Sequence, residues 1–384
     1  RASLELGSGD PTCNRVLDQG HQELLPVHLA RSAAAGPVAA AGDLGDGSLL
    51  LITAEGVLER LDIAGGALTE LGRLPPGAGH IAIHPGPGPG SVVVSAGEAA
   101  FRIHRDGAVL PLALQGYIGV GRGSGEGRLL IWGTGDNGWM IVTGTEERAV
   151  AQGTLPCTPA GPQAGALDAD GTGPIVICSD GTLHAAAQDP ATGPVDLGGK
   201  IRRACVAPGG ARGVTLTFDD KLTSHGFADG SAAALNPGPQ DPGVLDISCN
   251  WGEDILLGID SRERLTIWRL TTGERIGTHY IGGYDRGGPM PTYRNGLTAW
   301  SDSHGDVHVW DWDQKRTLGE ALVGTFMVSA TLTGDGQAGL LWVVAEDGIF
   351  RGWSVDRRPP VRRVEGPVPA PPEGAAPTPE AQQW

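Results

Sequence analysis

The chain has 384 residues, of which 63 are glycine and 29 are proline, and its formal net charge is −16. Glycine and proline cost a helix interior about 1 and about 3 kcal/mol each, so this composition argues against a helical bundle or a helix-rich enzyme. The acidic balance disfavours nucleic-acid and anionic-lipid binding, and no apolar run is long enough to predict membrane insertion. Hydrophobic residues make up 40% and recur in short runs, which predicts a folded protein of many short strands.

Residues 1–36 form a predicted N-terminal segment, in which the apolar stretch at 23–29 can form one strand. Arginine far outnumbers lysine among the 28 basic residues, which is typical of a GC-rich genome, and we expect a bacterial source. No signal peptide is visible at the start of the sequence, so we expect a soluble, cytoplasmic protein. A signal peptide lost before residue 1 stays an alternative.

An internal repeat fills residues 37–364. Each unit has an apolar strand, a glycine-rich turn, a second apolar strand, a short turn and a third strand. The units lie at 38–63, 80–104, 117–142, 165–187, 203–227, 244–270, 290–312 and 327–353. Their third-strand anchors are Leu58, Phe101, Met140, Leu183, Leu222, Leu265, Val307 and Ile349. A period of about 42 residues with three or four strands is the blade spacing of a β-propeller.

Two of these units resemble WD40 repeats. They are LTIWRLTTGERIG at 265–277 and VHVWDWDQKRTLG at 307–319, and Trp310-Asp311 matches the dipeptide that names the family. Trp268-Arg269 and Trp353-Ser354 keep only the tryptophan, and the other five units keep only the strand rhythm. The resemblance, to a degenerate WD40-like propeller, implies an interaction module with loops on two faces.

The ends of the repeat region bear on the number of blades. The last unit ends near Asp356 without a clear fourth strand, and the strand at 23–29 could complete that blade and close the ring. An open ring would leave an unpaired strand edge. Eight units with this closure predict an all-β propeller of eight blades, with seven as the alternative. Residues 365–384 are rich in proline and alanine and predict a solvated tail or linker.

The five cysteines, Cys13, Cys157, Cys178, Cys205 and Cys249, are odd in number and lack CxxC spacing. This pattern indicates neither a disulfide framework nor a structural zinc site. We therefore expect Cys178, Cys205 and Cys249 to be small, buried strand residues.

No motif indicates catalysis, a cofactor or a metal. The GxGxxG match at 133–138 lies between two predicted strands rather than before a helix, so it predicts a hairpin turn. The pairs His80/His84 and His304/His308 would span about 13 Å on extended chain, too far to share one ion directly. Ligands from other blades could still join either histidine.

One predicted loop gathers residues typical of binding hot spots. The connection between units six and seven, at 279–288, carries Tyr280, Tyr284, Asp285 and Arg286, and the chain has only four tyrosines. In a WD40-like strand order, Arg262, Arg264 and His304 would lie beside it on the top face. The alternative is that both tyrosines pack against the rim of blade seven.

Three functional hypotheses follow. The first is a non-catalytic interaction or scaffold module that presents its top face to a protein partner, either by itself or as part of a larger signalling or assembly protein. The second is a propeller enzyme, such as a metal-dependent lactonase or another hydrolase, with ligands meeting at the central channel. The third is a carbohydrate-binding propeller, which the irregular loops disfavour. The fold alone does not choose among them.

Overall fold

The computed structural model describes residues 27–357, apart from gaps at 33–35, 63–66, 77–80, 89, 117, 124–126, 145–148, 158–160, 186–193, 236–242, 285–289, 322, 324–326, 335–337, 346 and 348. The described residues form strands and turns. They contain no helix long and apolar enough to cross a bilayer.

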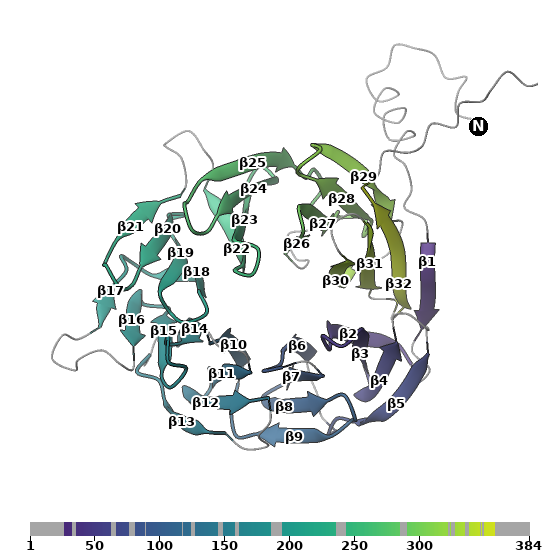
Figure 1. Ribbon diagram of the computed structural model, residues 1–384, viewed down its shortest axis with the longest axis horizontal. Helices are drawn as coiled ribbons and strands as arrows, with labels where there is room; N and C mark the ends of the chain where they lie inside the picture. The colour runs from purple at the N-terminus through teal and green to yellow at the C-terminus, as the bar shows by residue number, and fades with distance from the viewer. Residues whose placement is uncertain are drawn as a thin grey trace, which may run out of the picture.

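Eight four-stranded antiparallel sheets stand as blades around a central channel (Figure 1), which confirms the predicted all-β propeller of eight blades. In the first four blades the strands, from the channel outward, are β2 (Val38–Asp43), β3 (Ser48–Thr53), β4 (Val57–Asp62) and β5 (Leu68–Arg73); β6 (Ile81–Pro85), β7 (Ser91–Ala96), β8 (Ala99–His104) and β9 (Val109–Leu112); β10 (Ile118–Arg122), β11 (Arg128–Gly133), β12 (Gly138–Thr143) and β13 (Ala151–Thr154); and β14 (Pro162–Leu167), β15 (Pro174–Cys178), β16 (Thr182–Ala185) and β17 (Val195–Asp196).

The next three blades follow the same order. Their strands are β18 (Ile201–Val206), β19 (Arg212–Thr217), β20 (Leu222–Gly226) and β21 (Ala232–Ala234); β22 (Val244–Asn250), β23 (Ile255–Asp260), β24 (Arg264–Arg269) and β25 (Arg275–Tyr280); and β26 (Thr292–Arg294), β27 (Leu297–Ser301), β28 (Val307–Asp311) and β29 (Arg316–Ala321). All eight predicted anchors fall on third strands, so the repeat register is confirmed. The GxGxxG match is the hairpin turn between β11 and β12, as expected.

The eighth blade joins the two ends of the chain. It contains β30 (Met327–Gly334), β31 (Ala338–Ala345), β32 (Ile349–Asp356) and, outermost, β1 (Val27–Ser32). β1 runs antiparallel to β32, from Val27 opposite Trp353 to Ser32 opposite Ile349. The predicted closure by an N-terminal strand is therefore confirmed. The strand extends further toward the C-terminus than the stretch at 23–29, whose first four residues lie outside the described chain.

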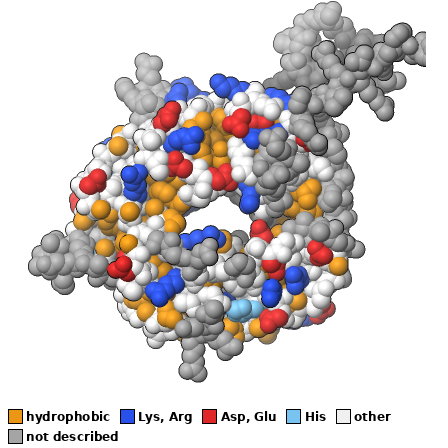
Figure 2. Space-filling model, viewed as in Figure 1, with side chains coloured by type: hydrophobic (Ala, Val, Ile, Leu, Met, Phe, Trp, Pro, Cys, Tyr) orange, Lys and Arg blue, Asp and Glu red, His pale blue; other side chains and the backbone are white. Residues whose placement is uncertain are grey.

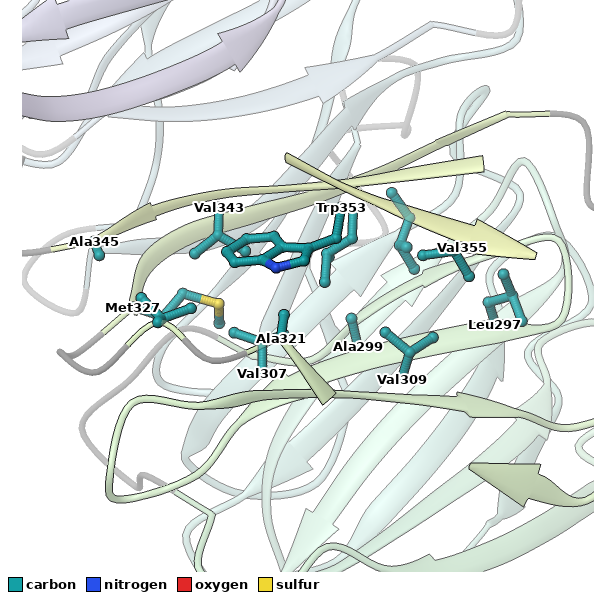
Figure 3. Packing of buried hydrophobic residues seen from close by; sticks show 13 residues of the cluster. Leu297, Ala299, Val307, Val309, Ala321, Met327, Val343, Ala345, Trp353 and Val355 are labelled. Atoms are coloured by element: carbon teal, nitrogen blue, oxygen red, sulfur yellow. The ribbon is translucent and has the colours of Figure 1, made fainter. Parts of the chain in front are cut away.

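The core lies between blades. The second strands β3 and β7 are buried along their whole length, because each blade is covered by a neighbour on both faces. This explains why SLLLIT and SVVVSA read as continuous apolar runs rather than alternating ones. Figure 3 shows one such layer, in which Val307 and Val309 on β28 face Val343 on β31 and Trp353 on β32. Burying one such side chain stabilises the fold by about 1.5–3 kcal/mol.

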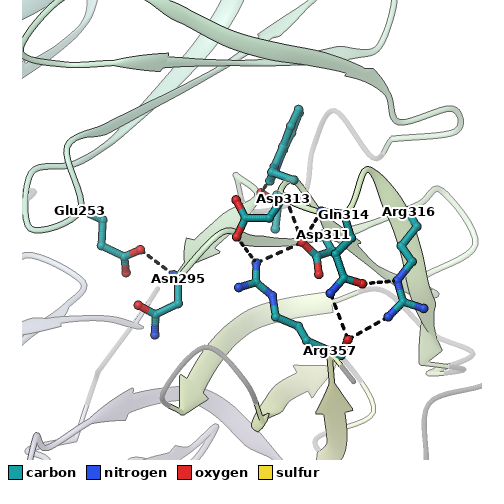
Figure 4. Close-up of polar contacts among 9 residues, drawn as sticks. Glu253, Asn295, Asp311, Asp313, Gln314, Arg316 and Arg357 are labelled. Carbon is teal, nitrogen blue, oxygen red and sulfur yellow. Dashed lines mark hydrogen bonds and ion pairs between the residues drawn. The ribbon is translucent and has the colours of Figure 1, made fainter. Parts of the chain in front are cut away.

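Polar bonds link equivalent positions of neighbouring blades, as Figure 4 shows. The backbone amide of Asn295 in blade seven donates to Glu253 of blade six at 2.5 Å. Arg357, directly after β32, donates from Nη2 to Asp311 Oδ1 at 3.1 Å and also contacts Asp313 at 3.2 Å. Asp311 is the aspartate of the Trp-Asp dipeptide and is fully buried. It therefore ties the closing blade to blade seven.

Two disulfides join neighbouring blades, so the prediction that the cysteines form no disulfide framework is wrong, although Cys178, Cys205 and Cys249 do lie on strands. Cys157, in the connection after β13, bonds Cys178 on β15 with a Cα–Cα distance of 5.3 Å. Cys205 on β18 bonds Cys249 on β22 with a Cα–Cα distance of 6.3 Å. The second pair is separated by 44 residues, close to one repeat, which places the two thiols at equivalent positions of adjacent inner strands. Cys13 lies outside the described residues.

Glycine lets the inner strands of adjacent blades approach each other. A Cβ added to Gly121 on β10 would lie 2.0 Å from the carbonyl oxygen of Gly165 on β14. Backbone sits against backbone there, so no side chain can move aside. The high glycine content thus serves the packing of inner strands as well as the turns.

Candidate functional site

The turns between second and third strands and the connections between blades emerge on the same face, here called the top face. On this face three segments of blades six and seven form one surface, the blade 6–7 patch, made of residues 260–264, 280–284 and 302–304. The amides of Ile281 and Gly283 donate to the backbone and side chain of Glu263, at 2.8 and 2.9 Å. The Ser303 amide donates to Gly283, and Tyr284 bridges to Asp302. The patch is therefore held by its own backbone.

The predicted site residues have different positions within this patch. Tyr280, the last residue of β25, is 62% exposed, and Arg262 is exposed on the neighbouring turn. The side chain of His304 is 83% exposed. Arg264 donates from Nε to Asp260 Oδ2 at 2.7 Å and is only partly exposed.

Tyr284, in contrast, is 8% exposed and belongs to the apolar cluster that contains Ile281 and Trp300. Its side chain lies in the core of this region rather than on the surface. Asp285 and Arg286 lie outside the described residues.

Gly282 leaves room for the ring of Tyr280. A Cβ at Gly282 would lie 2.5 Å from Cε1 of that ring, so the aromatic ring lies directly over the glycine. An exposed tyrosine resting on backbone has less freedom than one that extends into solvent. This lowers the entropy that a partner must remove on binding.

Within the patch, Asp302 organises the turn between β27 and β28. Its Oδ1 accepts the amides of His304 and Asp306 at 2.8 and 3.0 Å, and its Oδ2 lies 3.1 Å from Nε2 of His308. Burial alone would raise the pKa of Asp302, but hydrogen bonds from His308 and from the two amides outweigh burial and lower it. Burial raises the pKa of Glu320 on β29, despite His308 nearby, and Asp306 and Asp302 add to the rise.

The expected separation of His304 and His308 is wrong for this pair. Nδ1 of His304 and Nε2 of His308 both lie within 4 Å of Asp302 Oδ2. The estimate assumed extended chain, whereas residues 302–306 form a tight turn that folds His304 back. Within the described residues, Asp302, His308 and Glu320 place one ligand-type atom each within 4.8 Å of the others. His80 of the other pair lies outside the described chain.

The central channel forms a cavity with a volume of about 1090 Å³, and Figure 2 shows it as an opening through the ring. The inner strands line it with Arg122, Gln163, Asn250, Tyr293 and the Cys205–Cys249 disulfide. His84 also faces it; burial lowers the pKa of this histidine, and its Nε2 has no hydrogen-bond partner among the residues that the structure describes. In the part of the chain that the structure describes, the three-residue ligand group lies on blade seven and not among these channel residues.

The comparisons with known proteins add support for the fold. No protein-family model and no curated protein match the sequence. Among solved structures, the chain is similar to the computationally designed Ika8 protein, with 13% identity, a TM-score of 0.60, and coverage of 87% of this chain and 100% of that one. It is also similar to BamB from Moraxella catarrhalis (13% identity, TM-score 0.53, 86% and 98% covered) and to Sqt1 from Saccharomyces cerevisiae (10% identity, TM-score 0.61, 87% and 100% covered). At these identities the similarity shows the fold alone, so function has to be inferred from the site.

Proposed function

We propose that this chain is a degenerate WD40-like propeller that binds a protein partner through the blade 6–7 patch, as a non-catalytic interaction or scaffold module. One observation carries the proposal: Tyr280, Arg262 and His304 stand exposed on three segments that backbone hydrogen bonds hold together. Tyrosine and arginine are enriched at binding hot spots, and a rigid surface costs little entropy to dock.

Within this proposal the residues have distinct roles. Tyr280 is the aromatic anchor, and Arg262 and His304 offer hydrogen-bond donors beside it. Arg264 is held by Asp260 and positions the turn that carries Arg262. Tyr284 positions the connection from below. Asp285 and Arg286, which follow it in the chain, are proposed as further contacts.

The WD40 relationship rests on Trp310-Asp311 and on the strand order. Asp311 Oδ1 accepts the amides of Asp313 and Gln314 at 3.0 and 3.1 Å and so closes the turn between the third and fourth strands. Asp311 therefore stabilises the blade, on the face opposite the patch. This supports a propeller in which the repeat residues stabilise the blades and the top face binds the partner.

The two disulfides favour an oxidising compartment over the cytoplasm that the sequence suggested. Disulfides persist in secreted and periplasmic proteins and are rare in cytosolic ones. We therefore propose that the protein acts outside the cytoplasm. Thiol alkylation of urea-denatured protein without reductant, followed by mass spectrometry, tests this: Cys157, Cys178, Cys205 and Cys249 should stay unlabelled until a reductant is added. Ready labelling without reductant would support the cytoplasm.

Affinity capture from the native host, with mass spectrometry, tests the binding proposal. Phe218 gives a matched control, because it lies on the top face, in the turn after β19, and is 63% exposed. The double variant Tyr280→Ala/Arg262→Ala should lose a stoichiometric partner that both wild type and Phe218→Ala retain. Retention of the partner by the double variant would refute the patch as the binding site.

A further inference from the structure

Blade seven brings two carboxylates and an imidazole together on one face of its sheet. His308 on β28 lies directly opposite Glu320 on β29 in the strand register, so their side chains share a face. Asp302 reaches the same place from the turn that precedes β28. Trp300 is paired with His308 on the other side and stacks on its ring at 5.5 Å, which fixes the plane of the imidazole.

We propose that Asp302, His308 and Glu320 form a binding site for a Zn²⁺ ion. Nε2 of His308 lies 3.1 Å from Asp302 Oδ2 and 4.0 Å from Glu320 Oε1. Zinc bonds to nitrogen and oxygen are about 2.0–2.2 Å, so ligand atoms around a tetrahedral ion stand about 3.3–3.6 Å apart. Shifts of about an ångström in side-chain position bring the three atoms to that spacing.

The surroundings orient the ligands before the metal arrives. The amides of His304 and Asp306 hold Asp302 Oδ1, so Oδ2 is the oxygen turned toward His308. Partners of this kind fix the direction of a metal ligand and contribute to affinity. Each of the three side chains is only 14–15% exposed, so the ion would be largely shielded from water.

The charge of the site also calls for a cation. Two carboxylates, those of Asp302 and Glu320, lie 3.1 and 4.0 Å from the same imidazole nitrogen of His308. Among the described residues, Glu320 accepts no hydrogen bond, and its nearest partner is the His308 nitrogen at 4.0 Å, which Asp302 already engages. A carboxylate that is only 15% exposed is poorly compensated in that position, and a divalent ion would compensate both acids at once.

The donor set selects zinc over the hard cations. Calcium and magnesium prefer sites made of oxygen, whereas an imidazole with carboxylates suits zinc. His304 can complete the coordination, because its exposed ring already places Nδ1 at 3.9 Å from Asp302 Oδ2. The set would then be two imidazoles and two carboxylates, with a water in place of His304 as the alternative fourth ligand.

Calorimetric titration of Zn²⁺ into tag-free protein, dialysed first against a chelator, tests the site. We expect one ion per chain, and an affinity at least about tenfold weaker in Glu320→Gln and in His308→Asn. His184 gives the matched control: it lies on β16, the third strand of blade four, 3.2 Å from Thr182 and beside the turn residue Asp180, and among the described residues it belongs to no group of three ligand-type side chains. His184→Asn should bind zinc as wild type does.

Cobalt provides a second measurement that needs no variant. Co²⁺ bound by nitrogen and oxygen in a tetrahedral site gives saturable visible absorption, which one equivalent of Zn²⁺ should abolish. His304→Ala should weaken binding and change this spectrum if His304 is the fourth ligand. The proposal would be overturned if wild type showed no saturable zinc binding. It would also be overturned if the folded variants Glu320→Gln and His308→Asn bound zinc with the same affinity as wild type. The site stands on blade seven alone and does not depend on partner binding.

Discussion

Replacing Arg357 with Met tests whether the charged link between the last two blades stabilises the ring. The substitution keeps an apolar stem and removes the guanidinium, which leaves Asp311 charged and fully buried. Breaking a buried ion pair by removing one partner costs about 3–5 kcal/mol. The amides of Asp313 and Gln314 still donate to Asp311, at about 1 kcal/mol each, so we expect a loss of about 1–3 kcal/mol.

Urea unfolding, followed by tryptophan fluorescence, measures this loss if the slope with denaturant stays constant. Arg351→Met is the control, because Arg351 pairs with Asp347 on the same blade at a partly exposed position, where a pair contributes about 0–1 kcal/mol. Adding Asp311→Asn to Arg357→Met should restore stability, since the amide removes the buried charge but keeps an acceptor for the two backbone donors. A cost for Arg357→Met no larger than for Arg351→Met, or no recovery in the double variant, would refute this reasoning.

Three further predictions concern the ring. Cys205→Ser/Cys249→Ser should lower the free energy of unfolding by about 3–4 kcal/mol in urea titrations without reductant, and addition of reductant should remove the difference between this variant and wild type, because the other disulfide is then reduced in both. Gly121→Ala should lower the free energy of unfolding by about 1–3 kcal/mol, because the added Cβ meets backbone. Gly144→Ala should lower it by less than about 1 kcal/mol, because no atom of the described residues outside its chain neighbours lies within 4 Å of the added Cβ. Equal shifts in melting temperature would contradict the packing argument. Burial lowers the pKa of His225 in the folded protein, so on acidification this histidine is protonated first in the unfolded chain. The free energy of unfolding should therefore fall as the pH drops through about 6.5 and stop falling below the folded pKa. His225→Asn should flatten this pH dependence in unfolding curves collected between pH 8 and 5.

The fold could be predicted from the sequence because a propeller blade is a local unit. Three strands within about 30 residues carry their own apolar pattern, so anchors such as Leu58 and Leu265 fix the period without any knowledge of distant contacts. The number of blades then follows from the number of units, and the missing fourth strand after Asp356 indicates where the ring closes.

Contacts between blades were harder to predict. Cys205 and Cys249 bond because they occupy equivalent positions one repeat apart, a relation visible in the sequence only once the period is used as a ruler. The separation of His304 and His308 was overestimated because the turn after Ser301 folds back. Tyr284 was predicted from composition alone, which cannot tell an exposed tyrosine from one that fills the space beside Trp300. The direction of the backbone in a turn and the burial of a side chain determine these properties, and neither can be read from residue type and spacing alone.

Closure of the ring also sets an order in time. β1 is synthesised before the other seven blades, whereas its ladder partner β32 is synthesised after them. Until then β1 has no strand to pair with, and blade eight presents an open edge, the kind of surface that recruits other chains. A chain that stops before residue 349 could never hide that edge. Closure of blade eight therefore requires synthesis through β32, since only then is the outer strand β1 paired.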